Sequence, residues 1–119
     1  MRIINLYADE AGESHFRDLD IDWQQSGKSN KLSPDFPTSR LFFRESTRAF
    51  NVDWHCAPRR QFIINLDGRV KVTASDGEAR TLQPGDVVLI EDTHGKGHLT
   101  ENLDDQPRIS IFIPLAGED

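Results

Sequence analysis

Short apolar segments separated by tight-turn residues recur along the chain from residue 40 onward. Val70 and Val72 alternate with charged or polar neighbours, and Val87–Ile90 is a continuous apolar run. Asp67–Gly68 and Asp76–Gly77 lie between such segments, and Asp-Gly pairs favour two-residue hairpins because glycine tolerates a positive φ. No window has the sustained i, i+3, i+4 apolar spacing of a capped helix. This layout predicts an all-β sandwich or barrel.

The expected strands all lie in the last two-thirds of the chain: 40–45, 50–55, 61–66, 69–74, 79–82, 87–90 and 108–115. Residues 1–23 mix short apolar pieces with acidic residues. Residues 24–39 are rich in Ser, Pro, Gln and Asn, which is typical of a loop. We therefore expect a barrel core at about 40–115, preceded by an N-terminal strand and loop extension.

Composition limits the function classes. The 119 residues are enough for one domain, so we expect a single domain over 1–119. The net charge is −6, and the densest basic cluster is Arg59–Arg60, which argues against a nucleic-acid partner. No segment approaches the ~20 apolar residues of a membrane helix, so no membrane partner is expected. A lone cysteine and an N-terminus unlike a signal peptide favour a cytoplasmic location.

Two motif-like segments lie between residues 55 and 98. In the first, His55 is followed by Gln61, and Gly68 comes after six more residues; Ala57 lies two positions after His55. This spacing resembles the first motif of the cupin family, G-x5-H-x-H-x3,4-E-x6-G. His55 takes the first histidine position, Ala57 the second and Gln61 the glutamate position. The resemblance implies a double-stranded β-helix, the small jelly-roll barrel.

The second segment begins at Gly85 and resembles the second cupin motif, G-x5-P-x-G-x2-H-x3-N. Glu91 and Thr93 replace its proline and glycine, and His98 lies two residues later than the pattern. The phrases DWHCAPRRQ and EDTHGKGH are similar to a subgroup of small bacterial cupins without a settled activity. The two motifs together cover most of the stretch that we expect to form the barrel.

The resemblance implies a divalent transition metal, such as Fe, Ni, Zn or Mn, because cupins usually bind one through three histidines and a glutamate. This chain keeps histidine at two of the four positions. His55, Gln61 and His98 could form a weaker site completed by water, since imidazole suits most of these metals. The alternative is a metal-free barrel in which His55 and His98 are polar pocket residues.

Three further side chains are candidates for binding a small ligand. Gln61 and Asn65 share one face of their strand, because side chains alternate, and the resemblance places this face inside the barrel. Arg59 lies two residues before Gln61 and could bind a carboxylate or phosphate through two parallel hydrogen bonds. Lys96, in a glycine-flanked loop, could add positive charge. The alternatives are buried amides that bond each other and cations that face solvent.

Two hypotheses for function follow. The first is an enzyme with metal-dependent oxygenase, isomerase or lyase-type chemistry, in which His98 or Glu91 moves protons. The second is a non-catalytic module that binds or senses a small polar or anionic molecule without metal. A metal-free sugar isomerase ranks last, because in such relatives a phenol assists the histidine and the lone Tyr7 lies outside the motifs. Adjacent acids such as Glu91–Asp92 also occur simply as turn residues.

A homodimer is expected as well, because small cupins often pair through exposed apolar faces. Trp23, Phe36, Phe42 and Phe43 could supply such a face. Large exposed apolar patches usually mark interfaces.

Overall fold

The computed structural model describes residues 1–47 and 51–118, and these residues form twelve strands and no helix. The strands are β1 Arg2–Ala8, β2 Ser14–Asp20, β3 Gln24–Ser26, β4 Asn30–Leu32, β5 Phe42–Ser46, β6 Asn51–His55, β7 Gln61–Asp67, β8 Val70–Ala74, β9 Ala79–Leu82, β10 Val87–Ile90, β11 His98–Asn102 and β12 Arg108–Pro114. Phe50, which we expect at the start of a strand, lies outside the described residues. No helix of the described ranges is long and apolar enough to cross a membrane.

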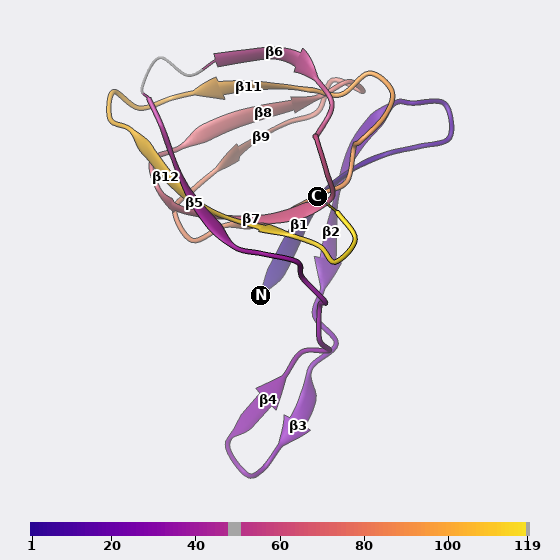
Figure 1. The fold of residues 1–119 in the computed structure, drawn as a ribbon, viewed down its shortest axis with the longest axis vertical. Coiled ribbons are helices and arrows are strands. Elements are labelled where there is room, and N and C mark those ends of the chain that lie inside the picture. The colour runs from indigo at the N-terminus through magenta and orange to yellow at the C-terminus, as the bar shows by residue number, and fades with distance from the viewer. Residues whose placement is uncertain (48–50, 119) are drawn as a thin grey trace.

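Two sheets face each other and enclose the interior of the barrel (Figure 1). The larger sheet has the strand order β2-β1-β10-β7-β12-β5, and the smaller has β6-β11-β8-β9. Strands β1 and β10 run parallel, and the other described pairs are antiparallel. The chain passes repeatedly from one sheet to the other, as it does in a jelly roll. The predicted fold class, an all-β jelly-roll barrel, is confirmed.

The two Asp-Gly turns have different roles. Asp76–Gly77 joins β8 to β9, which pair with each other, so this hairpin prediction is confirmed. Asp67–Gly68 joins β7 to β8, and these strands belong to different sheets. The hairpin prediction there is wrong, because the turn forms a corner between the sheets. Gly68 has a φ of 81° at this corner, a conformation that favours glycine.

The barrel begins earlier in the chain than residue 40. Strand β1 lies inside the six-stranded sheet, between β2 and β10. Ile4 and Leu6 are only 2% and 1% exposed, and they join the inner apolar cluster together with Val88 and Ile90. The predicted core boundary is therefore wrong, because the apolar pieces of the first 20 residues complete the barrel wall. The expected loop at 24–39 contains the β3–β4 hairpin, which projects from the barrel (Figure 1).

The six-stranded sheet is apolar on both faces. Its inner face contributes to the main cluster, and its outer face carries a second cluster around Ile3, Phe62 and Leu89. Phe36 packs edge-on against Phe62, with ring centres 5.2 Å apart. Phe43 is 70% exposed on neighbouring β5, whereas its neighbour Phe42 turns inward and lines a cavity. The homodimer stays a prediction, but Phe42 cannot belong to its outer face.

Candidate functional site

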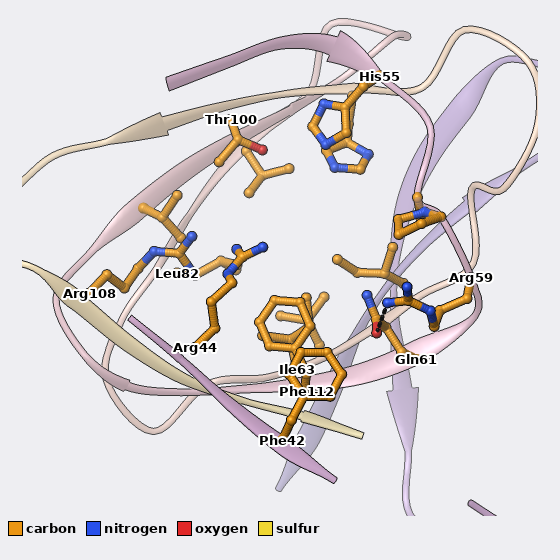
Figure 2. Close-up of a pocket in the computed structure, with 17 residues that line it drawn as sticks. Phe42, Arg44, His55, Arg59, Gln61, Ile63, Leu82, Thr100, Arg108 and Phe112 are labelled. Atoms are coloured by element: carbon orange, nitrogen blue, oxygen red, sulfur yellow. Dashed lines mark hydrogen bonds between the residues drawn. The ribbon is translucent and has the colours of Figure 1, made fainter. Parts of the chain in front are cut away.

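A cavity of about 330 Å³ lies between the two sheets (Figure 2). This volume is within the usual range of small-molecule pockets, about 300–1,000 Å³. Its walls combine apolar side chains with arginines and histidines: Phe42, Arg44, His55, Ala57, Pro58, Arg59, Gln61, Ile63, Val70, Val72, Leu82, Val88, Ile90, His98, Thr100, Arg108 and Phe112. No Asp or Glu is among these lining residues, although the whole chain has a net charge of −6.

His98 and Asp92 form a buried pair at one side of the cavity. His98 begins β11 and is 5% exposed, and Asp92 is 0% exposed. Nδ1 of His98 lies 2.5 Å from Oδ2 of Asp92. Because a carboxylate only accepts hydrogen bonds, Nδ1 carries the proton, and a neutral ring keeps its lone pair on Nε2. The pair therefore gives the cavity a base of fixed tautomer.

His55 lies beside His98 because their strands are paired. The two residues are register partners of β6 and β11, and their ring centres are 4.4 Å apart. Nδ1 of His55 lies 2.9 Å from the backbone oxygen of Asp53, so this nitrogen donates. Gly97 has no Cβ, which lets the chain pass close to this strand. A Cβ at this position would lie 2.2 Å from the backbone oxygen of His55. Both predicted histidines are thus brought together.

Two arginines that sequence analysis did not single out extend into one end of the cavity (Figure 2). Arg108 is 4% exposed and donates to the neutral oxygens of Asn102 and Ser110, at 3.2 and 3.3 Å. Burial, together with the nearby charge of Arg44, lowers the pKa of Arg108 to about 10. Burial also lowers the pKa of Arg44, whose guanidinium lies 4.3 Å from the ring centre of Phe112.

Arg59 and Gln61 lie at the opposite end of the cavity from Arg44 and Arg108 (Figure 2). Gln61 begins β7 and is 2% exposed. Its Oε1 accepts a hydrogen bond from Nη1 of Arg59 at 3.3 Å. The Nε of Arg59 is buried and has no hydrogen-bond partner among the described residues. The structure thus brings both predicted residues to the cavity.

The donor set does not fit a divalent transition metal. Structural and catalytic sites for such metals usually have three or four protein ligands. The described residues hold no group of three His, Cys, Asp or Glu side chains placed to bind a metal ion. The oxygen of Gln61 already faces the guanidinium of Arg59. His55 and His98 alone fall short of a metal site, and three cationic side chains share their cavity.

Asn65 shares the inward face with Gln61, but it does not line the cavity. It is 1% exposed, and its amide donates to the backbone oxygen of Gly68 at 2.6 Å. Its Oδ1 lies 3.5 Å from the hydroxyl of Ser110. Asn65 therefore stabilises the corner at Gly68 and lies outside the lining of the cavity.

Glu91 and Lys96 also lie outside the cavity. Because Ile90 points inward, alternation turns Glu91 outward, where it accepts two hydrogen bonds from Arg60 at 2.9 and 2.7 Å. The carboxylate that meets His98 is that of the next residue along, not Glu91. Nζ of Lys96 lies 2.8 Å from the carboxylate of Glu13, with 65% of its side chain exposed. Neither expected role, as base or as ligand contact, fits these positions.

A separate ionic cluster ties together turns at one end of the barrel. His15 lies between two carboxylates, 2.7 Å from Asp9 and 2.8 Å from Asp76. The hydrogen bond to Asp9, followed by that to Asp76, raises the pKa of His15 above its usual 6.5. Conversely, His15 lowers the pKa of Asp9. The cluster joins the end of β1 to the β8–β9 hairpin.

Comparison with known proteins gives a distant structural likeness. No family model matches the sequence, and no curated protein matches it. The crystal structure of a Salmonella typhimurium LT2 protein that bears the name ethanolamine utilization protein Q is similar over 97% of this chain and 95% of that chain, with 13% identity and a TM-score of 0.34. The strand order and register of this chain, rather than that likeness, define its jelly-roll fold.

Proposed function

We propose that this protein binds a small anionic organic molecule in its cavity and that Arg44 and Arg108 hold the anionic group. The main support is Arg108, which is 4% exposed and donates hydrogen bonds to the uncharged oxygens of Asn102 and Ser110. A buried cation without a counter-charge is costly, and an anion at this end would offset the cost. Guanidinium groups bind carboxylates and phosphates through paired, charge-assisted hydrogen bonds.

The apolar wall of the cavity favours an organic anion over an inorganic one. Phe42 and Phe112 are stacked with ring centres 5.2 Å apart, and Ile63 and Leu82 line the same space. Covering such a wall with the carbon skeleton of a ligand contributes about 25 cal/mol per Å² of apolar surface removed from water. Inorganic phosphate would leave this contribution unused.

Calorimetry with defined probes tests the proposal. Hexanoate and benzoate should bind more tightly than inorganic phosphate, and Arg108→Met should weaken both carboxylates by roughly ten- to a hundred-fold, since hydrogen bonds to charged groups contribute about 1.5–3 kcal/mol. Arg69→Met is the matched control, because Arg69 pairs with Asp104 on the surface. Equal affinities in the wild type and Arg108→Met, with circular dichroism showing both folded, would refute the proposal.

A second candidate function is proton transfer on the bound ligand, and the Asp92–His98 pair favours it. The carboxylate of Asp92 fixes the tautomer of His98, so Nε2 can accept a proton from a C–H or O–H group of the ligand. Positive charge from Arg44 and Arg108 would stabilise the anion that forms. This chemistry uses only side chains of the chain itself.

Hydrogen–deuterium exchange tests this second candidate. In D₂O, the C3 protons of 2-oxobutanoate should exchange faster with the protein than without it, as followed by NMR. Asp92→Asn should slow the exchange by at least about ten-fold while leaving the affinity for hexanoate unchanged, because it alters the base and not the arginines. Equal exchange rates for the two proteins would rule out His98 as the base.

A further inference from the structure

We infer that the ligand of this cavity has two acidic groups, one at each end of an apolar body, and that Arg59 binds the second group. This inference rests on the proposed function and deepens it by naming the class of ligand. It rests on the order of polar and apolar side chains along the cavity, and on the buried Nε of Arg59, which has no hydrogen-bond partner among the described residues.

The register of β12 places the two polar ends far apart. Ser110 lies opposite Arg44 of β5, and Pro114 lies opposite Gln61 of β7. Four residues of strand separate these positions, or about 13 Å at ~3.3 Å per residue. Arg108 lies two residues further from Gln61 along the same strand. The two groups of arginines are therefore attached to well-separated parts of the cavity wall.

An apolar band separates the ends. Phe112 lies between Ser110 and Pro114 on the inward face of β12, and its partners are Phe42 on one side and Ile63 on the other. All three side chains line the cavity, and Figure 2 shows them between the two groups of arginines. Such a band fits a carbon skeleton, methylene or aromatic, and offers no hydrogen bond to it.

The second end repeats the situation of the first. Arg59 makes its hydrogen bond to an uncharged amide, that of Gln61. Its Nε is buried without a hydrogen-bond partner among the described residues, which leaves a donor unsatisfied. A buried donor without a partner costs about 1–3 kcal/mol, and an acidic group of the ligand would satisfy it. No Asp or Glu among the lining residues can do so.

The neighbouring residue supplies a matched contrast. Arg60 turns away from the cavity and bonds Glu91, with Glu118 nearby at 3.8 Å. The two adjacent arginines, Arg59 and Arg60, therefore differ in whether a carboxylate of the chain neutralises them. One is neutralised by carboxylates of the chain, and the other enters a cavity whose lining contains none. The geometry points to dicarboxylates, or carboxylates with a phosphate at the far end, as the ligand class.

Calorimetry with paired probes tests the inference. Glutarate, adipate, suberate and terephthalate are compared with hexanoate, octanoate and benzoate. We expect at least one dicarboxylate to bind about ten-fold more tightly than its matched monocarboxylate. Arg59→Gln should abolish that difference, and Arg60→Gln should leave both series unchanged. In the same series, 4-phosphonobutanoate distinguishes a phosphate from a carboxylate at Arg59, and its advantage should likewise disappear in Arg59→Gln.

The outcomes separate the two proposals. If monocarboxylates bind and dicarboxylates bind no better, or if Arg59→Gln keeps the advantage of the dicarboxylate, the second acidic group is wrong and the anion site at Arg108 stands. If no probe of either series binds at millimolar concentration, the anion site itself is wrong. Thermal melts of each variant verify that it is folded.

Discussion

Replacing Arg108 by methionine should make the ligand-free protein more stable while it weakens ligand binding. Arg108 is 4% exposed, and it has Asn102 and Ser110 as uncharged hydrogen-bond partners. Methionine keeps much of the length of the arginine stem and removes the buried charge. A residue kept for function at the expense of stability shows this combination.

The size of the effect follows from the pKa of Arg108, which burial, together with the nearby charge of Arg44, lowers from its ordinary value to about 10. At about 1.4 kcal/mol per pH unit, the folded state disfavours the charged form by about 3 kcal/mol. Loss of the two hydrogen bonds costs about 0.5–1 kcal/mol each, at the low end of the usual range because these bonds are long, at 3.2 and 3.3 Å. We therefore expect Arg108→Met to gain about 1–2 kcal/mol. The unfolded chain holds the proton of Arg108 more tightly than the folded protein does. The cost of burying this charge in the wild type is therefore fully present below about pH 10, and it decreases as pH rises above that value.

Urea denaturation at pH 7, without added carboxylates or phosphate, measures the change. In a thermal melt of the same proteins, each 1 kcal/mol of added stability should raise Tm by about 3–5 °C in a domain of this size. Arg69→Met is the control, because its surface ion pair with Asp104 is screened by solvent and should contribute little to stability. An Arg108→Met protein that is less stable than the wild type by 1 kcal/mol or more would refute the reasoning, since Arg108 would then be a structural residue.

Three further predictions concern the glycine beside the histidines, the ionic cluster and the oligomer. Gly97→Ala should cost at least about 1 kcal/mol more than Gly77→Ala in urea denaturation, because both have positive φ but the new Cβ would clash with His55 at position 97 and meet nothing at position 77. Equal losses of stability in the two variants would contradict the predicted clash at position 97. His15 has a raised pKa, so its contribution to stability is full below about pH 6.5 and is lost as pH rises through the raised value. The stability difference between the wild type and His15→Gln should therefore be larger at pH 6 than at pH 9, and a pH-independent difference would count against the cluster. Light scattering at micromolar concentration should give twice the chain mass, whereas a value near 13.5 kDa would exclude the homodimer.

Alternation along a strand gives two faces, but it does not say which face is inside. On β12 the isoleucines 109, 111 and 113 share one face, as expected, and that face turns away from the cavity. The inward face holds Arg108 and Phe112 instead. Since both faces of the sheet are partly covered, the hydrophobic pattern could not identify the inner one. This is why the buried Arg108 could not be found from the hydrophobic pattern, whereas the motif spacing located His55 and Gln61.

The Asp-Gly pairs correctly predicted where the chain turns, but they could not predict whether the strands that they join pair with each other. An Asp-Gly pair needs the same backbone whether the next strand returns in the same sheet or crosses to the other, so Gly68 and Gly77 look alike in the sequence. Similarly, two adjacent acids offered two candidates for the partner of His98. Only the inward position of Ile90 shows that Asp92, two residues on, is the one that faces His98.

The parallel pairing of β1 with β10 has a consequence for how the protein folds. The hydrogen bond from Asn5 to the backbone of Leu89 joins residues 84 positions apart. Contacts of such long range are formed late, because the intervening chain must first be ordered, and they slow folding. Until β1 arrives, β10 is an exposed sheet edge, which invites pairing with other chains. Strand β1 thus cannot complete the wall of the barrel until residues 84 positions later in the chain have been ordered.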